Sequence, residues 1–167
     1  PLERLTHPWY AAGLRAGIRA DRATPSASLA AVTGRPAQGN HTTHFSVLDR
    51  DGNRVAATLS INYPFGSGFM APGTGVLLND EMDDFSSKPG VPNVYGLVGA
   101  EANAIAPGKR PLSSMSPTFI ESERGVAVFG TPGGSRIITM VLLALLEYAD
   151  GGDAGSMVTL PRFHHQY

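Results

Sequence analysis

Two adjacent threonines stand where a polar, turn-prone stretch ends and an alternating strand begins. Thr42 is the first residue of this predicted strand. If the bond before it is cut, its hydroxyl can act as a nucleophile, because the freed α-amine serves as a built-in base. Threonine is also common in strands for steric reasons. The pair alone therefore favours a structural role, and other residues must support a catalytic one.

A second polar feature follows in the predicted hairpin of residues 43–48 and 54–62, which turns at residues 49–53. Because side chains alternate along a strand, Thr58, Ser60 and Asn62 fall on one face and the apolar residues on the other. This polar stripe is consistent with lining a site. A solvent-facing strand surface would give the same pattern.

Charged and hydroxyl groups gather further along the chain. Residues 80–84 hold four carboxylates in five positions, which fits a clamp for a substrate ammonium or a solvated helix start. Ser113 and Ser114 lie between Pro111 and Pro117, so they sit on a constrained loop. Neither feature points to a function by itself.

The glycine turn at residues 130–136 opens a predicted helix over 135–148. Paired glycines before a helix leave backbone N–H groups bare at the positive end of the helix dipole, which can bind an anion or an oxyanion. A turn required for close packing is the alternative. The helix is apolar on nearly every face, so we expect it to be buried between layers.

Metal sites are not indicated. The spacing from Asp49 resembles a calcium loop, but Arg54 replaces the glycine at the sixth position and Ser60 the glutamate at the twelfth. The neighbours His164 and His165 point apart in regular structure and cannot chelate on one face. No cofactor is expected.

Length and composition bound the remaining possibilities. The 167 residues are 42% hydrophobic and 16% charged, with a net charge of −1, which fits one soluble domain or a piece of one. The charge balance does not suggest nucleic acid or a membrane surface. Cysteine is absent, which excludes disulfides and thiolate chemistry.

The N-terminal part is predicted to contain a helix over residues 8–20 and an exposed linker over 21–41. The first residues have no apolar segment and do not form a signal peptide. Residues 137–146 are too few to span a bilayer. We expect the chain to be a fragment or a processed form.

Six motifs taken together resemble the γ-glutamyltranspeptidase family, and the match covers residues 42–167 nearly end to end. They are TTHFSV at 42–47, NDEMDDF at 79–85, PGVPN at 89–93, GKRPLSSMSPT at 108–118, PGGSRI at 132–137 and PRFHHQ at 161–166. The resemblance implies an α+β fold, the four-layer αββα sandwich of the N-terminal-nucleophile hydrolases, which these residues alone leave incomplete.

The resemblance also implies self-cleavage between His41 and Thr42. Residues 1–41 would end the large subunit, with a pre-cleavage linker, and residues 42–167 would form most of the small one. Thr42 would then attack a γ-glutamyl amide such as glutathione, and water or an acceptor amine would resolve the acyl-enzyme. Family members of this kind are periplasmic or secreted.

Catalytic roles carry over to four positions. Thr42 matches the nucleophile, and Ser60 takes the place of a supporting threonine, keeping its hydroxyl. Gly133 and Gly134 match the backbone amides of the oxyanion hole. We also expect a large-subunit portion, absent here, to supply an arginine for the substrate carboxylate, and a further helix and strand to follow Tyr167.

Substrate-binding roles carry over to six residues: Asn62, Glu81, Asp84, Ser113, Ser114 and Tyr95. Asp84 would hold the substrate α-amine, and Ser113 with Ser114 the α-carboxylate. Asn62 would contact either group, Glu81 stands where relatives have glutamine or glutamate, and Tyr95 lies in a lid-like loop. A related acylase, a poly-γ-glutamate hydrolase and a non-catalytic fragment are the alternatives.

Overall fold

The computed structural model describes residues 2–25, 41–93 and 96–165, and the chain divides into two compact units. The first unit contains the helices α1 (Leu2–Thr6) and α2 (Pro8–Ala16). His7 caps α2 by accepting from the Trp9 amide at 3.3 Å, and Pro8 occupies the first turn as predicted. The helix ends at Ala16, with Gly17 at its C-cap, and is therefore shorter than the predicted 8–20. Most of the predicted linker lies outside the described residues.

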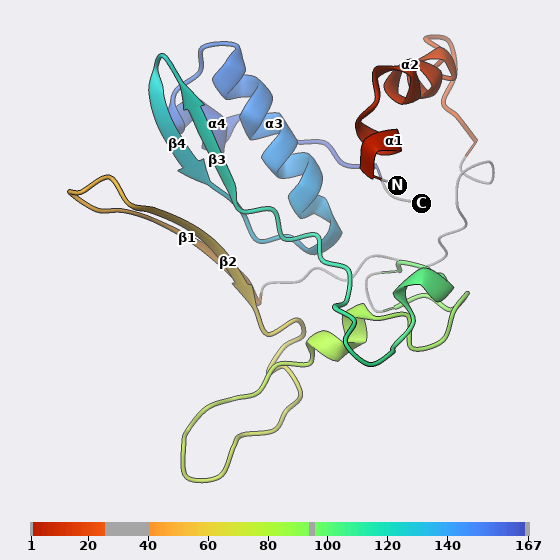
Figure 1. The fold of residues 1–167 in the computed structure, drawn as a ribbon, viewed down its shortest axis with the longest axis vertical. Coiled ribbons are helices and arrows are strands. Elements are labelled where there is room, and N and C mark those ends of the chain that lie inside the picture. The colour runs from red at the N-terminus through yellow and green to blue at the C-terminus, as the bar shows by residue number, and fades with distance from the viewer. Residues whose placement is uncertain (1, 26–40, 94–95, 166–167) are drawn as a thin grey trace. The chain divides into compact units, whose positions relative to one another are not determined.

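The second unit begins with an antiparallel hairpin of β1 (Thr42–Leu48) and β2 (Arg54–Ser60) (Figure 1). The Asp49 carboxylate accepts from the amides of Asp51 and Asn53 at 2.9 and 2.8 Å, and from the Asn53 side chain at 2.7 Å. These bonds and a left-handed Gly52 close the turn. The predicted hairpin is confirmed, and its register pairs Thr42 with Ser60.

The polar face of this hairpin points inward. Thr58 is 9% exposed, whereas Leu59 on the opposite face is 55% exposed. His44 bridges Thr58 and Ser46 through its two ring nitrogens, at 2.8 and 3.1 Å. The Ser46 hydroxyl donates to the Val128 carbonyl, which joins the first hairpin to the second. The polar stripe is therefore not a solvent-facing surface.

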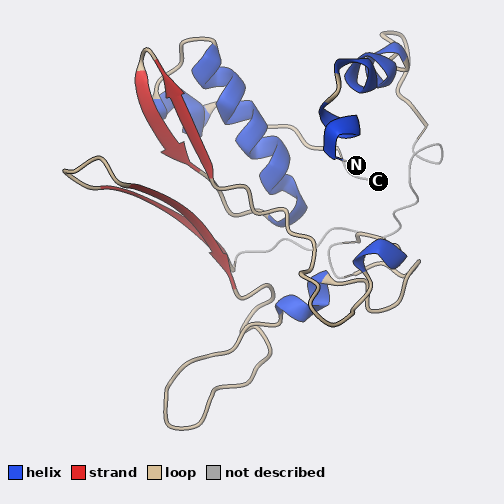
Figure 2. Ribbon diagram, viewed as in Figure 1, coloured by secondary structure: helices blue, strands red, loops and turns tan. Residues whose placement is uncertain are grey.

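A second hairpin, β3 (Thr118–Ser122) and β4 (Gly125–Phe129), lies beside the helix α3 (Ile137–Ala149), and α4 (Ala154–Thr159) packs on α3 (Figure 2). Arg124 in the hairpin turn joins the layers by donating to the carbonyls of Tyr148, Gly151 and Gly152. The predicted hairpin over 118–121 and 125–130 is thereby confirmed.

The helix α3 is only partly buried, unlike the prediction for an apolar helix between layers. Ile137 is 1% exposed and Ala144 is buried, but Ile138 and Leu146 are more than half exposed. One face of α3 packs within this chain, and the opposite face has no covering layer among the described residues. The sequence pattern indicates that this second face is apolar, but it does not indicate what packs against it.

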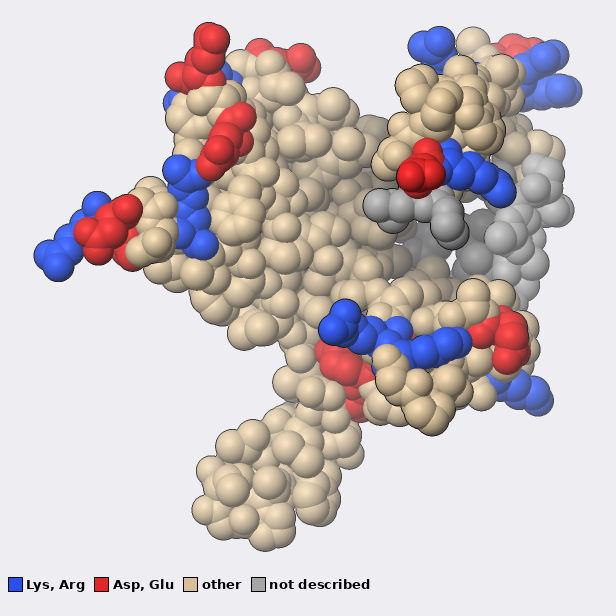
Figure 3. Space-filling view, in the orientation of Figure 1, with Lys and Arg blue, Asp and Glu red and all other residues tan. Residues whose placement is uncertain are grey.

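In their described part, residues 61–117 connect the two hairpins through loops and two short 3₁₀ helices, η2 (Glu81–Asp84) and η3 (Glu101–Asn103). Residues 63–78 form a lobe without charged residues, which Figure 3 shows as an uncharged surface. At its neck, Gly66 has a φ of +50°, and a Cβ there would lie 2.3 Å from the Leu78 carbonyl oxygen. In the described part of the chain, no helix is long and apolar enough to cross a membrane.

Candidate active site

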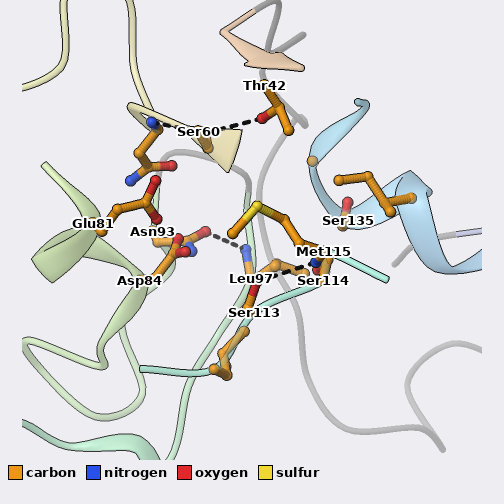
Figure 4. A pocket seen from close by; sticks show the side chains of 14 residues that line it. Thr42, Ser60, Glu81, Asp84, Asn93, Leu97, Ser113, Ser114, Met115 and Ser135 are labelled. Atoms are coloured by element: carbon orange, nitrogen blue, oxygen red, sulfur yellow. Dashed lines mark hydrogen bonds between the residues drawn. The ribbon is translucent and has the colours of Figure 1, made fainter. Parts of the chain in front are cut away.

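Thr42 lies at the open end of the first hairpin, beside its strand partner. Its Oγ1 is 3.0 Å from Ser60 Oγ, and either hydroxyl can donate (Figure 4). The Asn62 amide N–H donates to the same Ser60 oxygen at 2.9 Å. This contact fixes Ser60 against the chain and leaves its hydroxyl to exchange a proton with Thr42. The strand register thus builds a hydroxyl pair.

Asn62 connects this pair to the acidic segment. It is 4% exposed and has a φ of +67°, a conformation that asparagine tolerates better than most residues. Its Nδ2 lies 3.4 Å from the Asp80 carbonyl, and Asp80 Oδ1 accepts from the Tyr63 amide at 3.1 Å. The end of β2 and the start of η2 are therefore held together.

The carboxylates of Glu81 and Asp84 project from η2 into the same pocket as Thr42. Burial, followed by the charge and hydrogen bonding of Glu81, raises the pKa of Asp84 to about 7, and Asp80 and Asp83 act in the same direction. Glu81 Oε1 is buried and has no hydrogen-bond partner among the described residues. A cationic ligand would compensate both groups.

Ser113 and Ser114 line the pocket from an irregular loop. The Met115 amide donates to Ser113 Oγ at 3.1 Å, and the Ser116 hydroxyl donates to the Ser114 carbonyl at 3.0 Å. These short-range bonds hold the loop without regular structure. Two hydroxyls there can donate to a carboxylate, opposite a carboxylate pair that can bind an ammonium.

The glycine turn lies close to Thr42 as well. Gly134 lines the same pocket, and Gly133 lines a neighbouring cavity that Thr42 also borders. Both glycines have positive φ, at +145° and +60°, which is why other residues are disfavoured there. In the described part of the chain, no hydrogen bond uses the amide N–H of either glycine. These donors are available to a developing oxyanion.

The remaining predictions concern Tyr95, the histidines and metals. Tyr95 lies outside the described residues. His164 Nδ1 is 3.0 Å from Thr139 Oγ1, a structural contact between α3 and the chain after α4, and His165 is exposed. Among the described residues, no three His, Cys, Asp or Glu side chains gather closely enough to hold a metal ion.

The structure adds pocket residues to which the sequence had given no role. Asn93 and Leu97 line it from the loop over 88–100, and Met115 and Ser135 line it from the serine loop and the glycine turn. Asn93 is held by a pair of bonds with Leu97, through its backbone N–H and its Oδ1. The signal for Met115 and Ser135 was only their adjacency to predicted residues.

The chain is similar in sequence to a known protein family and to several curated proteins. The γ-glutamyltranspeptidase family model matches residues 1–167. A glutathione hydrolase proenzyme of Pseudomonas sp. strain A14 is 53% identical over 169 residues, covering 100% of this chain and 29% of that protein. The glutathione hydrolase proenzyme of Escherichia coli strain K12 is 49% identical with the same coverage.

A solved structure has the same fold. It is a crystal structure of an acivicin-inhibited γ-glutamyltranspeptidase, 54% identical with a TM-score of 0.70, and the likeness covers 75% of this chain and 68% of that one. This confirms the predicted α+β class and the N-terminal-nucleophile hydrolase fold. The chain spans 29% of the length of the two curated relatives. By the family match and the identities together, the chain belongs to the γ-glutamyltranspeptidase family.

Proposed function

We propose that the complete protein containing this chain transfers or hydrolyses γ-glutamyl groups, with Thr42 carrying the acyl group. The observation that carries the proposal is one pocket that combines a hydroxyl pair, a carboxylate pair and two serines. Its residues are Thr42, Ser60, Glu81, Asp84, Ser113 and Ser114. The names of the relatives, glutathione hydrolase proenzymes, support both the substrate class and a precursor form.

The active form requires cleavage before Thr42. Thr42 Oγ1 attacks the His41 carbonyl carbon, and its proton passes through Ser60 to the leaving Thr42 nitrogen as the C–N bond breaks. Water then hydrolyses the resulting ester, which leaves a carboxylate on His41 and a free α-amine on Thr42. Two contacts support this step: the hydroxyl pair, and the Ile61 amide, which donates to the His41 carbonyl at 3.5 Å. Residues 1–41 and 42–167 then belong to different subunits.

In turnover, the freed α-amine of Thr42 takes the hydroxyl proton while Oγ1 bonds to the γ-carbonyl carbon. The amides of Gly133 and Gly134 stabilise the oxyanion. The leaving amine accepts the proton and departs, which leaves an ester on Thr42. Water gives hydrolysis at this ester, and an acceptor amine gives transfer.

Substrate selection follows from the charges around the pocket. The carboxylates of Asp84 and Glu81 bind the α-ammonium, and the hydroxyls of Ser113 and Ser114 bind the α-carboxylate. Asn62 contacts one of these groups from the end of β2. A substrate with both α groups, a free γ-glutamyl unit, suits this arrangement better than the simple acyl chain of an acylase.

The test uses the complete precursor. We expect it to split into two chains, the smaller beginning at Thr42 by N-terminal sequencing, and to release aniline from a γ-glutamyl anilide. Thr42→Ala should stay intact by mass and be inactive. An uncut, inactive wild-type precursor, or full turnover by Thr42→Ala, would refute the proposal. Equal turnover of a glutaryl anilide, which lacks the α-amine, would favour the acylase alternative.

The cellular location rests on the family resemblance alone. We propose a periplasmic or secreted protein, and separation of periplasmic, cytoplasmic and medium fractions, followed by immunodetection, tests this. Recovery of the mature protein only with cytoplasmic markers would refute it.

A further inference from the structure

The Asn103 side chain joins the two loops that carry the opposite ends of the pocket. Its Nδ2 donates to the Asp84 carbonyl at 2.8 Å, and its Oδ1 accepts from the Leu112 amide at 3.0 Å. Asp84 carries one of the two pocket carboxylates, and Leu112 immediately precedes Ser113. One amide side chain therefore connects the carboxylate end to the serine end.

Backbone contacts hold Asn103 itself in place. The Ser86 amide donates to the Asn103 carbonyl at 2.9 Å, and Asn103 N–H donates to the Ala100 carbonyl at 3.0 Å. Lys109 stabilises the turn that contains Asn103. The Lys109 Nζ donates to the carbonyls of Ala102 and Ala104 at 3.2 and 3.1 Å. The bridge is thus anchored at η3 and is not a loose surface contact.

The bridge matters because no ladder of strand bonds holds these loops. Residues 85–117 contain only isolated β-bridges and the three-residue η3 in their described part. An asparagine amide offers a donor and an acceptor at a fixed spacing, which matches one carbonyl and one N–H. Aspartate keeps only the acceptor, and alanine keeps neither.

We propose that Asn103 is a positioning residue that sets the distance between the ammonium-binding and carboxylate-binding ends of the pocket. This inference rests on the proposed γ-glutamyl specificity and deepens it. Asn103 does not line the pocket with Thr42, so it acts through Asp84 and Ser113. Its loss should weaken recognition of the two α groups together and leave the chemistry at Thr42 intact.

The experiment compares Asn103→Ala with Asn53→Ala in the complete, matured protein. Asn53 is a matched control, because its side-chain amide also donates a hydrogen bond, to Asp49, but lies at the closed end of the first hairpin, away from the pocket. With a γ-glutamyl anilide, we expect Asn103→Ala to raise KM by about 10- to 100-fold with little change in kcat. With a glutaryl anilide, which lacks the α-amine, kcat/KM should change far less.

Two results would overturn the inference while leaving the proposed function standing. One is a KM for Asn103→Ala equal to that of Asn53→Ala. The other is an equal loss of kcat/KM on both anilides, which a merely structural role would produce. If Asn103→Ala does not mature, Asn103→Asp decides by the same measurements, since it lacks the donor to Asp84. An inactive wild type would instead refute the proposed function.

Discussion

Thr42 Oγ1 and Ser60 Oγ lie 3.0 Å apart on residues that face each other across the β1–β2 register. The contact therefore depends on the pairing of the two strands. The backbone N–H of Asn62 also donates a hydrogen bond to Ser60 Oγ. If Thr42 is the nucleophile, as we propose, its pairing with Ser60 reduces the reorganisation needed when substrate binds, which lowers the cost of reaching the transition state.

The first prediction concerns the Ser60 hydroxyl. Ser60→Ala should slow both precursor cleavage and kcat by about 10- to 100-fold, because it removes the hydroxyl that, in the proposed mechanism, relays and orients the Thr42 proton. Ser60→Thr should keep most of both rates, since it retains the oxygen. The appearance of the small subunit over time, and anilide release, measure the two steps. Full activity in Ser60→Ala would exclude Ser60 from the chemistry.

The second prediction concerns Asp84 and pH. In the proposed function, the ionised Asp84 carboxylate binds the substrate ammonium. The pKa of Asp84 is raised to about 7, first by burial and then by Glu81. KM for a γ-glutamyl anilide should therefore fall as pH rises through about 7. Asp84→Asn should give a high KM that does not vary over this range. Asp51→Asn is the control, because Asp51 is exposed, does not line the pocket and is not among the groups that shift the pKa of Asp84.

The same carboxyl group affects folding stability in the opposite sense. A carboxyl whose pKa is raised from 3.8 to about 7 in the folded state binds its proton more tightly there than in the unfolded chain. Its stabilising contribution is full below pH 3.8 and is lost as pH rises through about 7. Thermal melts of Asp84→Asn should lack this component of the pH dependence. An unchanged dependence would show that Asp84 titrates normally.

The third prediction separates backbone strain from catalysis at the glycine turn. Gly133 and Gly125 both have positive φ, at +145° and +113°, so alanine is strained at either position. A Cβ at Gly133 would also lie 3.3 Å from Met140 Sδ. Among the described residues, a Cβ at Gly125 would have no atom within 4 Å other than those of Gly125 itself and its chain neighbours. Both variants should lose about 1 kcal/mol or more of stability.

Only Gly133→Ala should also lower kcat, because a shift of the turn would move the amides that we propose to bind the oxyanion away from the reacting carbonyl. We expect a loss of about 10-fold or more. Melting temperature and kcat, measured on the same samples, make the distinction. A similar kcat loss in Gly125→Ala would attribute the effect to stability alone.

Local patterns were enough to predict the parts of the site that depend on one element. The residues at 49–53 strongly favour a tight turn. This was enough to predict the hairpin and the strand face that Thr58 and Ser60 share. The prolines around Ser113 correctly indicated an irregular, constrained loop. Roles for these residues came from the family resemblance, because a strand threonine has the same local signature whether or not it reacts.

Long-range contacts were beyond such patterns. Nothing near Asn103 in the sequence indicates that its side chain spans from residue 84 to residue 112. The partial exposure of α3 was also not predictable, because hydrophobicity indicates which faces tend to be buried but does not identify the partner. Likewise, the inward direction of the polar stripe depends on the link from Ser46 to Val128, which are 82 positions apart.

The closed turn around Asp49 has a consequence for how sequences of this kind can change length. Thr42 and Ser60 lie six pairs away from Leu48 and Arg54 at the turn, so the length of the turn determines which residue of β2 lies opposite Thr42. A single-residue insertion or deletion there would bring a residue from the other face of β2 opposite Thr42. Length variation should therefore be tolerated far more readily in the uncharged lobe at 63–78, which lies beyond the hairpin. The short turn at 49–53 resembles an ordinary surface loop but should tolerate it much less.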